Sequence, residues 1–277
     1  MNAMRDEWYP VALFSQLDRR DTMLMGEDIT VARVGDDEAK VTAADGRALP
    51  VRLRYGHVWT SLGAPDHELF DIPEADDPER RLVDVGIVRV QCSPLRAVEN
   101  FLDIAHFPFV HTDILGAEPH TEVFNYKVEI REEEDEVWAT QVKFYQPQAA
   151  KSASGGIDTD YMYRVPAPTC SVLYKSCPPR PGEWDVIALF VQPLTEELCE
   201  VWPWMALFDD TSSMTDLIQF QQMIFLQDRS ILENQIPARL PLDPGKEIPT
   251  RADMTSIAYR RWLKRHNYTY GAQLVAQ

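Results

Sequence analysis

The chain has 277 residues, with 27 Lys or Arg against 44 Asp or Glu, so its formal net charge is −17 at pH 7. This acidic balance argues against binding to nucleic acid or to an anionic membrane, because both would repel the protein on average. No apolar run approaches the roughly 20 residues that span a bilayer, and the amino terminus has no apolar signal core, so we expect a cytoplasmic protein without membrane contact.

Two parts of unequal size are predicted along the chain. Residues 28–60 contain short β-type runs separated by turn-forming stretches, which indicates a small β module. Residues 65–81 are rich in acidic residues and proline and are expected to form a connecting loop. We therefore predict a first domain over residues 1–85 and a second domain over residues 86–277.

The second part is predicted to be a sheet packed by helices. Residues 121–208 alternate apolar and polar side chains over several runs, a pattern typical of an antiparallel sheet with one face in solvent. Helical spacing precedes the sheet in residues 93–107 and follows it in residues 212–235, and prolines 108 and 237 end the two segments. The fold class is therefore α+β.

The four cysteines have none of the close spacings of a metal site. In a reducing compartment we expect reduced and mostly buried thiols at all four positions. They are Cys92, Cys170, Cys177 and Cys199.

Two histidines five residues apart, His106 and His111, form the first candidate site. On one continuous helix, Asn100, Asp103 and His106 would share a broad face, whereas His111 would lie about 140° around the helix. Pro108 interrupts the helix, so that the chain can bend His111 back toward His106. Two histidines near a helix end are more often structural than metal-binding, unless a third ligand joins them.

Asp228 is the candidate third ligand. The long C-terminal helix has an inward stripe from Leu217 through Ile224 to Ile231, and Asp228 falls on this stripe where leucine is expected. A buried carboxylate must be paired, neutralised or bound to a metal. From the residues alone, a salt bridge with Arg260 is favoured over a metal site, and both remain open. Two histidines and one carboxylate with open positions are the ligands used by non-haem Fe(II) oxygenases.

These residues carry a family resemblance. The run N-x-x-D-x-x-H-x-x-x-x-H, here Asn100, Asp103, His106 and His111, resembles the mononuclear-iron motif of Rieske-type aromatic-ring-hydroxylating oxygenases, α subunit. Other stretches are similar to the vanillate O-demethylase-like branch of that family and extend the resemblance over nearly the whole chain. They are WYPVA at 8–12, RYGHVWTSLG at 54–63, QDRSILENQ at 227–235 and RADMTSIAYRRWL at 251–263.

The resemblance implies an architecture and a set of residue roles. It implies a truncated Rieske-like β module followed by a helix-grip catalytic domain, and a homotrimeric assembly. It further implies that His106, His111 and Asp228 bind one Fe(II) per chain. Asp103 resembles the residue that bridges electron transfer between subunits, and Asn100 would stand beside the iron without strong ligation.

The sequence departs from the family at the iron–sulfur cluster. Family members hold a [2Fe-2S] cluster through C-x-H and C-x-x-H motifs, and this chain has neither motif. We therefore expect no such cluster, and electrons from a separate ferredoxin or Rieske subunit that docks near Asp103. Chemistry that needs no external reductant, or a loss of catalysis, are the alternatives.

The expected function is the catalytic component of a non-haem Fe(II) oxygenase that hydroxylates or O-demethylates a small aromatic or other apolar substrate with O2. The alternative is a non-catalytic subunit that binds a small molecule or serves assembly. Candidate pocket walls are aromatic, since apolar ligand pockets are commonly lined in this way, although core packing would explain the same residues. They are Phe107, Phe109, Trp202, Trp204 and Phe220.

Overall fold

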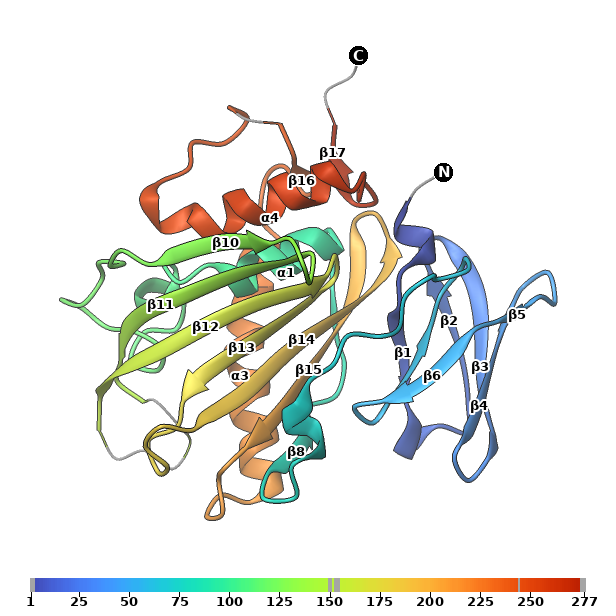
Figure 1. Cartoon of the computed structure of the whole chain (residues 1–277), viewed down its shortest axis with the longest axis horizontal. Coiled ribbons are helices and arrows are strands. Elements are labelled where there is room, and N and C mark those ends of the chain that lie inside the picture. Colours follow the sequence, from blue (N-terminus) through green and yellow to red (C-terminus); the bar gives the residue numbers. More distant parts are fainter. Residues whose placement is uncertain (1–2, 149–150, 152–154, 244, 275–277) are drawn as a thin grey trace.

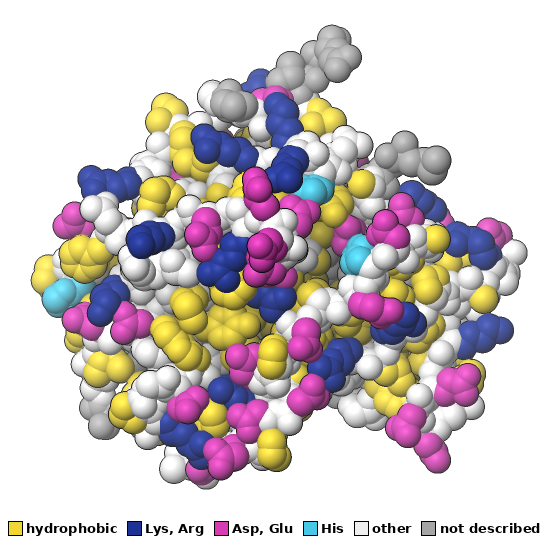
Figure 2. All heavy atoms as spheres, in the orientation of Figure 1, with side chains coloured by type: hydrophobic (Ala, Val, Ile, Leu, Met, Phe, Trp, Pro, Cys, Tyr) yellow, Lys and Arg dark blue, Asp and Glu magenta, His cyan; other side chains and the backbone are white. Residues whose placement is uncertain are grey.

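The computed structural model describes residues 3–148, 151, 155–243 and 245–274. It consists of a small N-terminal β module beside a larger body in which helices pack on one long sheet (Figure 1). In the described part of the chain, no helix combines the length and the hydropathy needed to cross a membrane. Acidic and basic side chains are interspersed over the face seen in Figure 2.

The large sheet has eight antiparallel strands in the order β10-β11-β12-β13-β14-β15-β8, and β9 also pairs with β15. The antiparallel sheet predicted for residues 121–208 is thereby confirmed, and the fold class is α+β. The six consecutive strands are β10 (Lys127–Arg131), β11 (Glu136–Gln146), β12 (Ile157–Ala167), β13 (Cys170–Ser176), β14 (Trp184–Thr195) and β15 (Leu198–Leu207). At the edge opposite β10, the short strands β8 (Arg81–Asp84) and β9 (Val88–Val90) both pair with β15.

Helices cover one face and one end of this sheet. They are α1 (Pro94–Leu102), α2 (Phe107–Val110), α3 (Met214–Leu232) and α4 (Met254–Arg265). α1 packs on β13 and β14, α3 packs on β8, β9 and α1, and α4 packs on β10 and β11. Serine side chains begin the two long helices next to the site, because Ser93 accepts a hydrogen bond from the backbone N–H of Leu95 and Ser213 accepts one from that of Asp216.

The described residues also contain several short elements. Four of them are 3₁₀ helices, at Ala3–Asp6, Phe14–Gln16, Pro73–Asp76 and Arg251–Asp253. Two are short parallel strands, β16 (Leu240–Pro241) and β17 (Ala272–Gln273).

The N-terminal module contains two small antiparallel sheets, of order β1-β7-β6 and β2-β3-β4-β5. Their strands are β1 (Tyr9–Leu13), β2 (Arg19–Leu24), β3 (Glu27–Gly35), β4 (Glu38–Ala43), β5 (Ala48–Leu49), β6 (Val51–Arg54) and β7 (His57–Thr60). The β2–β3 turn needs positive φ at Met25 and Gly26, and the backbone N–H groups of these two residues donate to the carbonyls of Pro193 and Leu194 in β14 at 2.8 Å. This turn therefore fastens the module to the large sheet.

The module covers the second face of the large sheet. Residues from both parts, among them Trp59, Phe190, Trp202 and Trp204, form one buried apolar cluster. Strands β13, β14 and β15 are consequently buried on both faces for most of their length. The prediction of one face in solvent is wrong for these strands, because period-two patterning describes one strand at a time and does not reveal a second layer.

Candidate metal centre

The segment from Asp103 to His106 differs from the predicted helix. α1 ends at Leu102, and Asp103 already has an extended backbone, with φ −83° and ψ 130°. The Oδ1 atom of Asp103 accepts a hydrogen bond from the backbone N–H of Ala105 at 2.9 Å. The predicted continuous helix is therefore wrong, because the carboxylate of Asp103 captures a backbone donor and turns the chain out of the helix.

Pro108 begins a helix rather than ending one. It lies in the first turn of α2, where its missing N–H costs no hydrogen bond. His106 directly precedes this one-turn helix and His111 directly follows it. Their Nε2 atoms lie 3.2 Å apart. One helical turn thus brings the two imidazoles together.

Asp228 reaches the same point from α3. Its Oδ1 atom lies 3.2 Å from Nε2 of His106 and 3.0 Å from Nε2 of His111. Asp228 is only 7% exposed and His111 only 1%. Among the residues that the structure describes, this trio is the one group of His, Cys, Asp and Glu side chains arranged to hold a metal ion.

The salt bridge considered for Asp228 is not formed. Nε of Arg260 lies 2.6 Å from Oε1 of Glu99, and Arg260 also pairs with Glu247. Arg96 pairs with the same two acids, which closes a network of four charged groups. The prediction of an Asp228–Arg260 pair is therefore wrong, since Arg260 has nearer partners.

Each histidine is oriented through its other ring nitrogen. Nδ1 of His106 donates to Oδ2 of Asp103 at 3.0 Å, and Nδ1 of His111 donates to Oε1 of Gln227 at 2.8 Å. This assignment of protons leaves both Nε2 atoms as lone-pair donors that face Asp228. Carboxylate and carbonyl partners of this kind fix the ring of a metal-binding histidine and raise its basicity. The sequence analysis did not predict that Gln227 orients His111. The only sequence feature that could have suggested this role is its position directly before Asp228.

The geometry of the three ligand atoms fits a six-coordinate divalent ion. Their mutual separations are 3.0 to 3.2 Å. At bonds of about 2.1 Å these separations subtend about 90–100° at a shared ion, nearer to octahedral than to tetrahedral geometry. Two imidazoles and one carboxylate would then occupy one face of the coordination sphere and leave the other positions open.

The pKa values of His106 and Asp228 are shifted by their contacts at this site. Burial disfavours the charged form of His106, but hydrogen bonds with Asp103 and Asp228 outweigh it and raise the pKa of His106 to about 9. Burial also opposes ionisation of Asp228, yet its hydrogen bonds with His106 and His111 lower the pKa of this carboxyl below its usual range. A divalent cation would displace the proton of His106, because metal ligands bind in their deprotonated form.

A cavity extends from the trio along the inner face of the sheet. Asn100, whose Nδ2 atom lies 3.4 Å from Oδ1 of Asp228, lines it beside the candidate metal ligands. Phe107 and Phe220, two of the predicted pocket walls, also line it. The centre therefore adjoins a largely apolar chamber of the kind that holds small aromatic molecules.

The other three predicted pocket walls do not line this cavity. Phe109 is 66% exposed. Trp202 and Trp204 are fully buried in the cluster between the sheet and the N-terminal module, on the opposite face from the metal ligands. The prediction is wrong for these residues, since aromatic composition identifies buried positions but not which side of the sheet they occupy.

Residues 90–267 match the family described as vanillate O-demethylase oxygenase C-terminal domain, which is more than half of the chain. The chain belongs to this oxygenase family. Membership confirms the resemblance to Rieske-type oxygenases that the motif around His106 and His111 suggested, and it makes the protein an oxidoreductase of the non-haem iron oxygenase type.

Two curated relatives of this oxygenase family come from Pseudomonas. "Probable methylxanthine N7-demethylase NdmC" of Pseudomonas sp. (strain TJI-51) is 43% identical over 270 residues, which cover 96% of this chain and 95% of the relative. "Methylxanthine N1-demethylase NdmA" of Pseudomonas putida is 26% identical over 229 residues, which cover 76% of this chain and 58% of the relative. The match therefore spans little more than half the length of the second relative.

Solved structures of Rieske-type oxygenases share the fold. Pseudomonas putida CBB5 NdmA with caffeine superposes with a TM-score of 0.74 at 19% identity, covering 95% of this chain and 90% of that one. Dicamba monooxygenase bound to 3,6-dichlorosalicylic acid gives a TM-score of 0.75 at 15% identity, covering 95% and 97%. At these identities the likeness concerns the fold alone, and it confirms the predicted α+β architecture.

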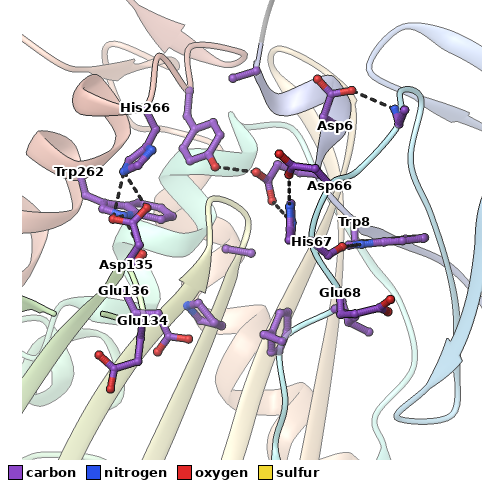
Figure 3. Close-up of a pocket in the computed structure, with 18 residues that line it drawn as sticks. Asp6, Trp8, Asp66, His67, Glu68, Glu134, Asp135, Glu136, Trp262 and His266 are labelled. Carbon is purple, nitrogen blue, oxygen red and sulfur yellow. Dashed lines mark hydrogen bonds and ion pairs between the residues drawn. The ribbon is translucent and has the colours of Figure 1, made fainter. Parts of the chain in front are cut away.

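A second and larger cleft lies away from the metal ligands. It has a volume of about 610 Å³ and lies between the N-terminal module and α4. Figure 3 shows His67 beside Asp66 on one wall, and His266 with Asp135 and Trp262 on the other. Its polar groups are largely engaged with one another, and none of the three candidate metal ligands lines it.

Proposed function

We propose that the chain is the mononuclear-iron component of an oxygenase that removes a methyl group from a small aromatic substrate with O2. The proposal rests on the convergence of His106 Nε2, His111 Nε2 and Asp228 Oδ1 at separations of 3.0 to 3.2 Å. Two histidines and a carboxylate on one face, with open positions beyond, are typical of non-haem Fe(II) oxygenases. Membership of the vanillate O-demethylase oxygenase family supports the same conclusion.

We infer that the substrate is an N-methylated heterocycle of the methylxanthine type. The support is the relative described as a methylxanthine N7-demethylase, which aligns with 96% of this chain at 43% identity. In the balanced reaction the N–CH3 group, O2, two electrons and two protons give N–H, formaldehyde and water. O-demethylation and hydroxylation of other small aromatic compounds form the wider class expected from the sequence.

The residues around the centre have separate roles in the proposed reaction. His106, His111 and Asp228 would hold Fe(II), which when bound would supply activation of O2 for oxidation of the methyl C–H bond. Asp103 and Gln227 hold the two imidazoles in place through the hydrogen bonds described above. Phe107 and Phe220 narrow the cavity and exclude water from the reacting methyl group.

Two electrons must reach the centre from outside the chain. The sequence contains no C-x-H or C-x-x-H pair, and the four cysteines are buried thiols, as expected. We propose a separate ferredoxin or Rieske subunit as the donor, docking near Asp103. This carboxylate is 27% exposed and contacts His106 at 3.0 Å, so it joins the surface to a metal ligand. We further propose a homotrimer, which analytical ultracentrifugation would test.

The first test is metal content. Protein purified anaerobically and supplied with Fe(II) is expected to hold about one iron per chain and no acid-labile sulfide. His111→Ala and Asp228→Ala are expected to lose that iron. Asp216→Ala, at the first turn of the same helix α3, is the matched control and should retain it.

The second test is turnover with an artificial electron donor and 7-methylxanthine, read as formaldehyde. Formaldehyde that appears with wild type and disappears with Asp228→Ala supports the demethylase. Wild-type protein that binds no iron after anaerobic loading contradicts the proposal and favours the alternative of a binding or assembly subunit, to which the missing cluster motifs already point.

A further inference from the structure

The sheet wall of the metal-site cavity carries polar side chains where an apolar row is expected. On β11 the inward residues are Val142, Phe144 and Gln146, and on β12 they include Tyr161 and Tyr163. The side chains of Gln146, Tyr161 and Tyr163 all line the cavity. A core that served packing alone would place aliphatic residues in this row, so the polar atoms call for an explanation.

Three of these polar atoms have no partner within the described chain. Oε1 of Gln146 and the hydroxyls of Tyr161 and Tyr163 are buried without a hydrogen bond, and each residue is only 1% exposed. Burial also raises the pKa of Tyr163, so its hydroxyl stays protonated and can donate. Buried polar groups are satisfied in nearly all native proteins, and a group left unpaired is costly. A ligand in the cavity is the natural source of the missing partners.

These groups lie on a wall lined by aromatic rings. The ring of Phe107 is 6.4 Å from that of Tyr161, which stacks on Tyr163 at 6.3 Å. Phe107 in turn is 5.1 Å from the ring of His106. A flat ring that reaches from the iron ligands along this wall would meet aromatic faces first and the polar groups beside them.

We propose that the carboxamide of Gln146 and the hydroxyl of Tyr163 hydrogen-bond the heteroatoms of the substrate ring. They thereby select a planar heterocycle with carbonyl and N–H groups, such as an oxidised purine, over a methylated ring of similar size without them. This inference rests on the proposed function and specifies which residues determine its substrate. A ring without heteroatoms would leave both groups unpaired, and sites built to bond a polar group reject such analogues strongly.

Other polar groups of the cavity agree with an oxygen-rich ligand. Lys175 of β13 is buried in the same wall, and burial lowers the pKa of its ammonium group to about 8 although Asp185 opposes the shift. Gln221 presents a further amide from α3.

The test measures binding to metal-free protein, so that it does not depend on catalysis. Isothermal titration calorimetry would compare 7-methylxanthine with 1-methylindole, a flat methylated bicycle without carbonyl groups. Gln146→Leu and Tyr163→Phe are each expected to weaken binding of 7-methylxanthine about tenfold or more and to leave or improve binding of 1-methylindole. Tyr145→Phe, which removes a hydroxyl from the residue before Gln146 on β11 and outside the cavity lining, is the control and should change neither.

The outcomes separate this inference from the proposed iron function. Equal affinity of both variants and wild type for 7-methylxanthine, or equal losses for both ligands, would overturn the assignment of Gln146 and Tyr163. Absence of 7-methylxanthine binding to wild type would overturn it as well, while iron content would still test the oxygenase. Conversely, Gln146→Leu could lose affinity for 7-methylxanthine alone while wild-type protein binds no iron. That result would support the recognition site and contradict the iron function.

Discussion

The Nδ1 atom of His111 lies 2.8 Å from Oε1 of Gln227, the residue directly before Asp228 on α3. One helix therefore supplies both a metal ligand and the group that orients a second ligand. A shift of α3 would move Asp228 and the ring of His111 together, whereas His106 is held separately by Asp103.

Gln227→Leu is expected to weaken iron binding by about 10- to 100-fold, because the ring of His111 loses the acceptor that fixes its orientation. Competition with a chelator under anaerobic conditions measures this affinity. Gln219→Leu, an exposed glutamine earlier on α3, is the control and should bind iron like wild type. Unchanged iron affinity in Gln227→Leu would mean that the hydrogen bond has no part in holding the metal.

Asp103→Asn is expected to separate electron delivery from metal binding. The one amide oxygen of asparagine can accept from His106 only if the backbone N–H of Ala105 loses its acceptor, and in that orientation iron should stay bound within about tenfold. Turnover driven by a protein electron donor should fall by about 100-fold or more, since the negative charge between surface and ligand is gone. Hydrogen peroxide supplies oxygen and both electrons together, so peroxide-driven product formation should fall far less. Equal losses in the two assays would argue against a bridging role.

Substitution by alanine should affect mainly stability at Trp204 and mainly substrate binding at Phe220. Trp204 is 1% exposed in the cluster behind the sheet, so Trp204→Ala should lower the free energy of unfolding by about 3–5 kcal/mol and leave iron per folded chain unchanged. Phe220 lines the cavity, so Phe220→Ala should weaken substrate binding at a smaller cost in stability. Urea unfolding and substrate titration measure the two effects. Loss of substrate affinity in folded Trp204→Ala would contradict this division.

The ion pair between His67 and Glu7 should stabilise the protein at acidic and neutral pH and lose this effect at alkaline pH. The hydrogen bond with Glu7 outweighs partial burial and raises the pKa of His67 to about 9, above the unfolded value near 6.5. The contribution is complete below pH about 6.5 and is lost as pH rises through about 9. Because the imidazole is half exposed, the effect should stay below about 1 kcal/mol.

The comparison is between wild type and His67→Gln in urea unfolding. The variant should be less stable at about pH 6 and equal to wild type at about pH 10. His120→Gln, at an exposed histidine, serves as the control. A difference that persists unchanged at the higher pH would exclude the ion pair with Glu7 as its cause.

The sequence predicts the long sheet well because period-two alternation is a local property of each strand. It also predicts the α3 helix and the inward position of Asp228, because the stripe repeats at helical spacing. It does not predict the break at Asp103, where a side chain competes with the backbone for Ala105. Nor does it reveal which face Trp202 and Trp204 occupy, since that depends on the packing of a module more than a hundred residues away in the chain.

The pairing of His111 with Gln227 illustrates the same limit at the candidate site. Spacing alone suggests ligands that lie close in sequence, such as His106 and His111. The partner of His106, Asp103, is also close in sequence, but the partner of His111 is Gln227 on α3, and only the assembled fold brings these two together. The unpaired oxygen of Gln146 is equally invisible in the sequence, where a glutamine at the end of a strand would be read as exposed.

The pairing of β8 with β15 bears on how the chain can be divided. β8 shields the backbone of Trp204 to Leu207 at the sheet margin, although it precedes the predicted boundary near residue 85. A fragment that starts at residue 86 would leave this apolar strand with open hydrogen-bonding groups, a template for aggregation. The smallest self-standing catalytic piece would therefore have to begin before Arg81, and even then Trp202 and Trp204 would lose the cover that the N-terminal module provides.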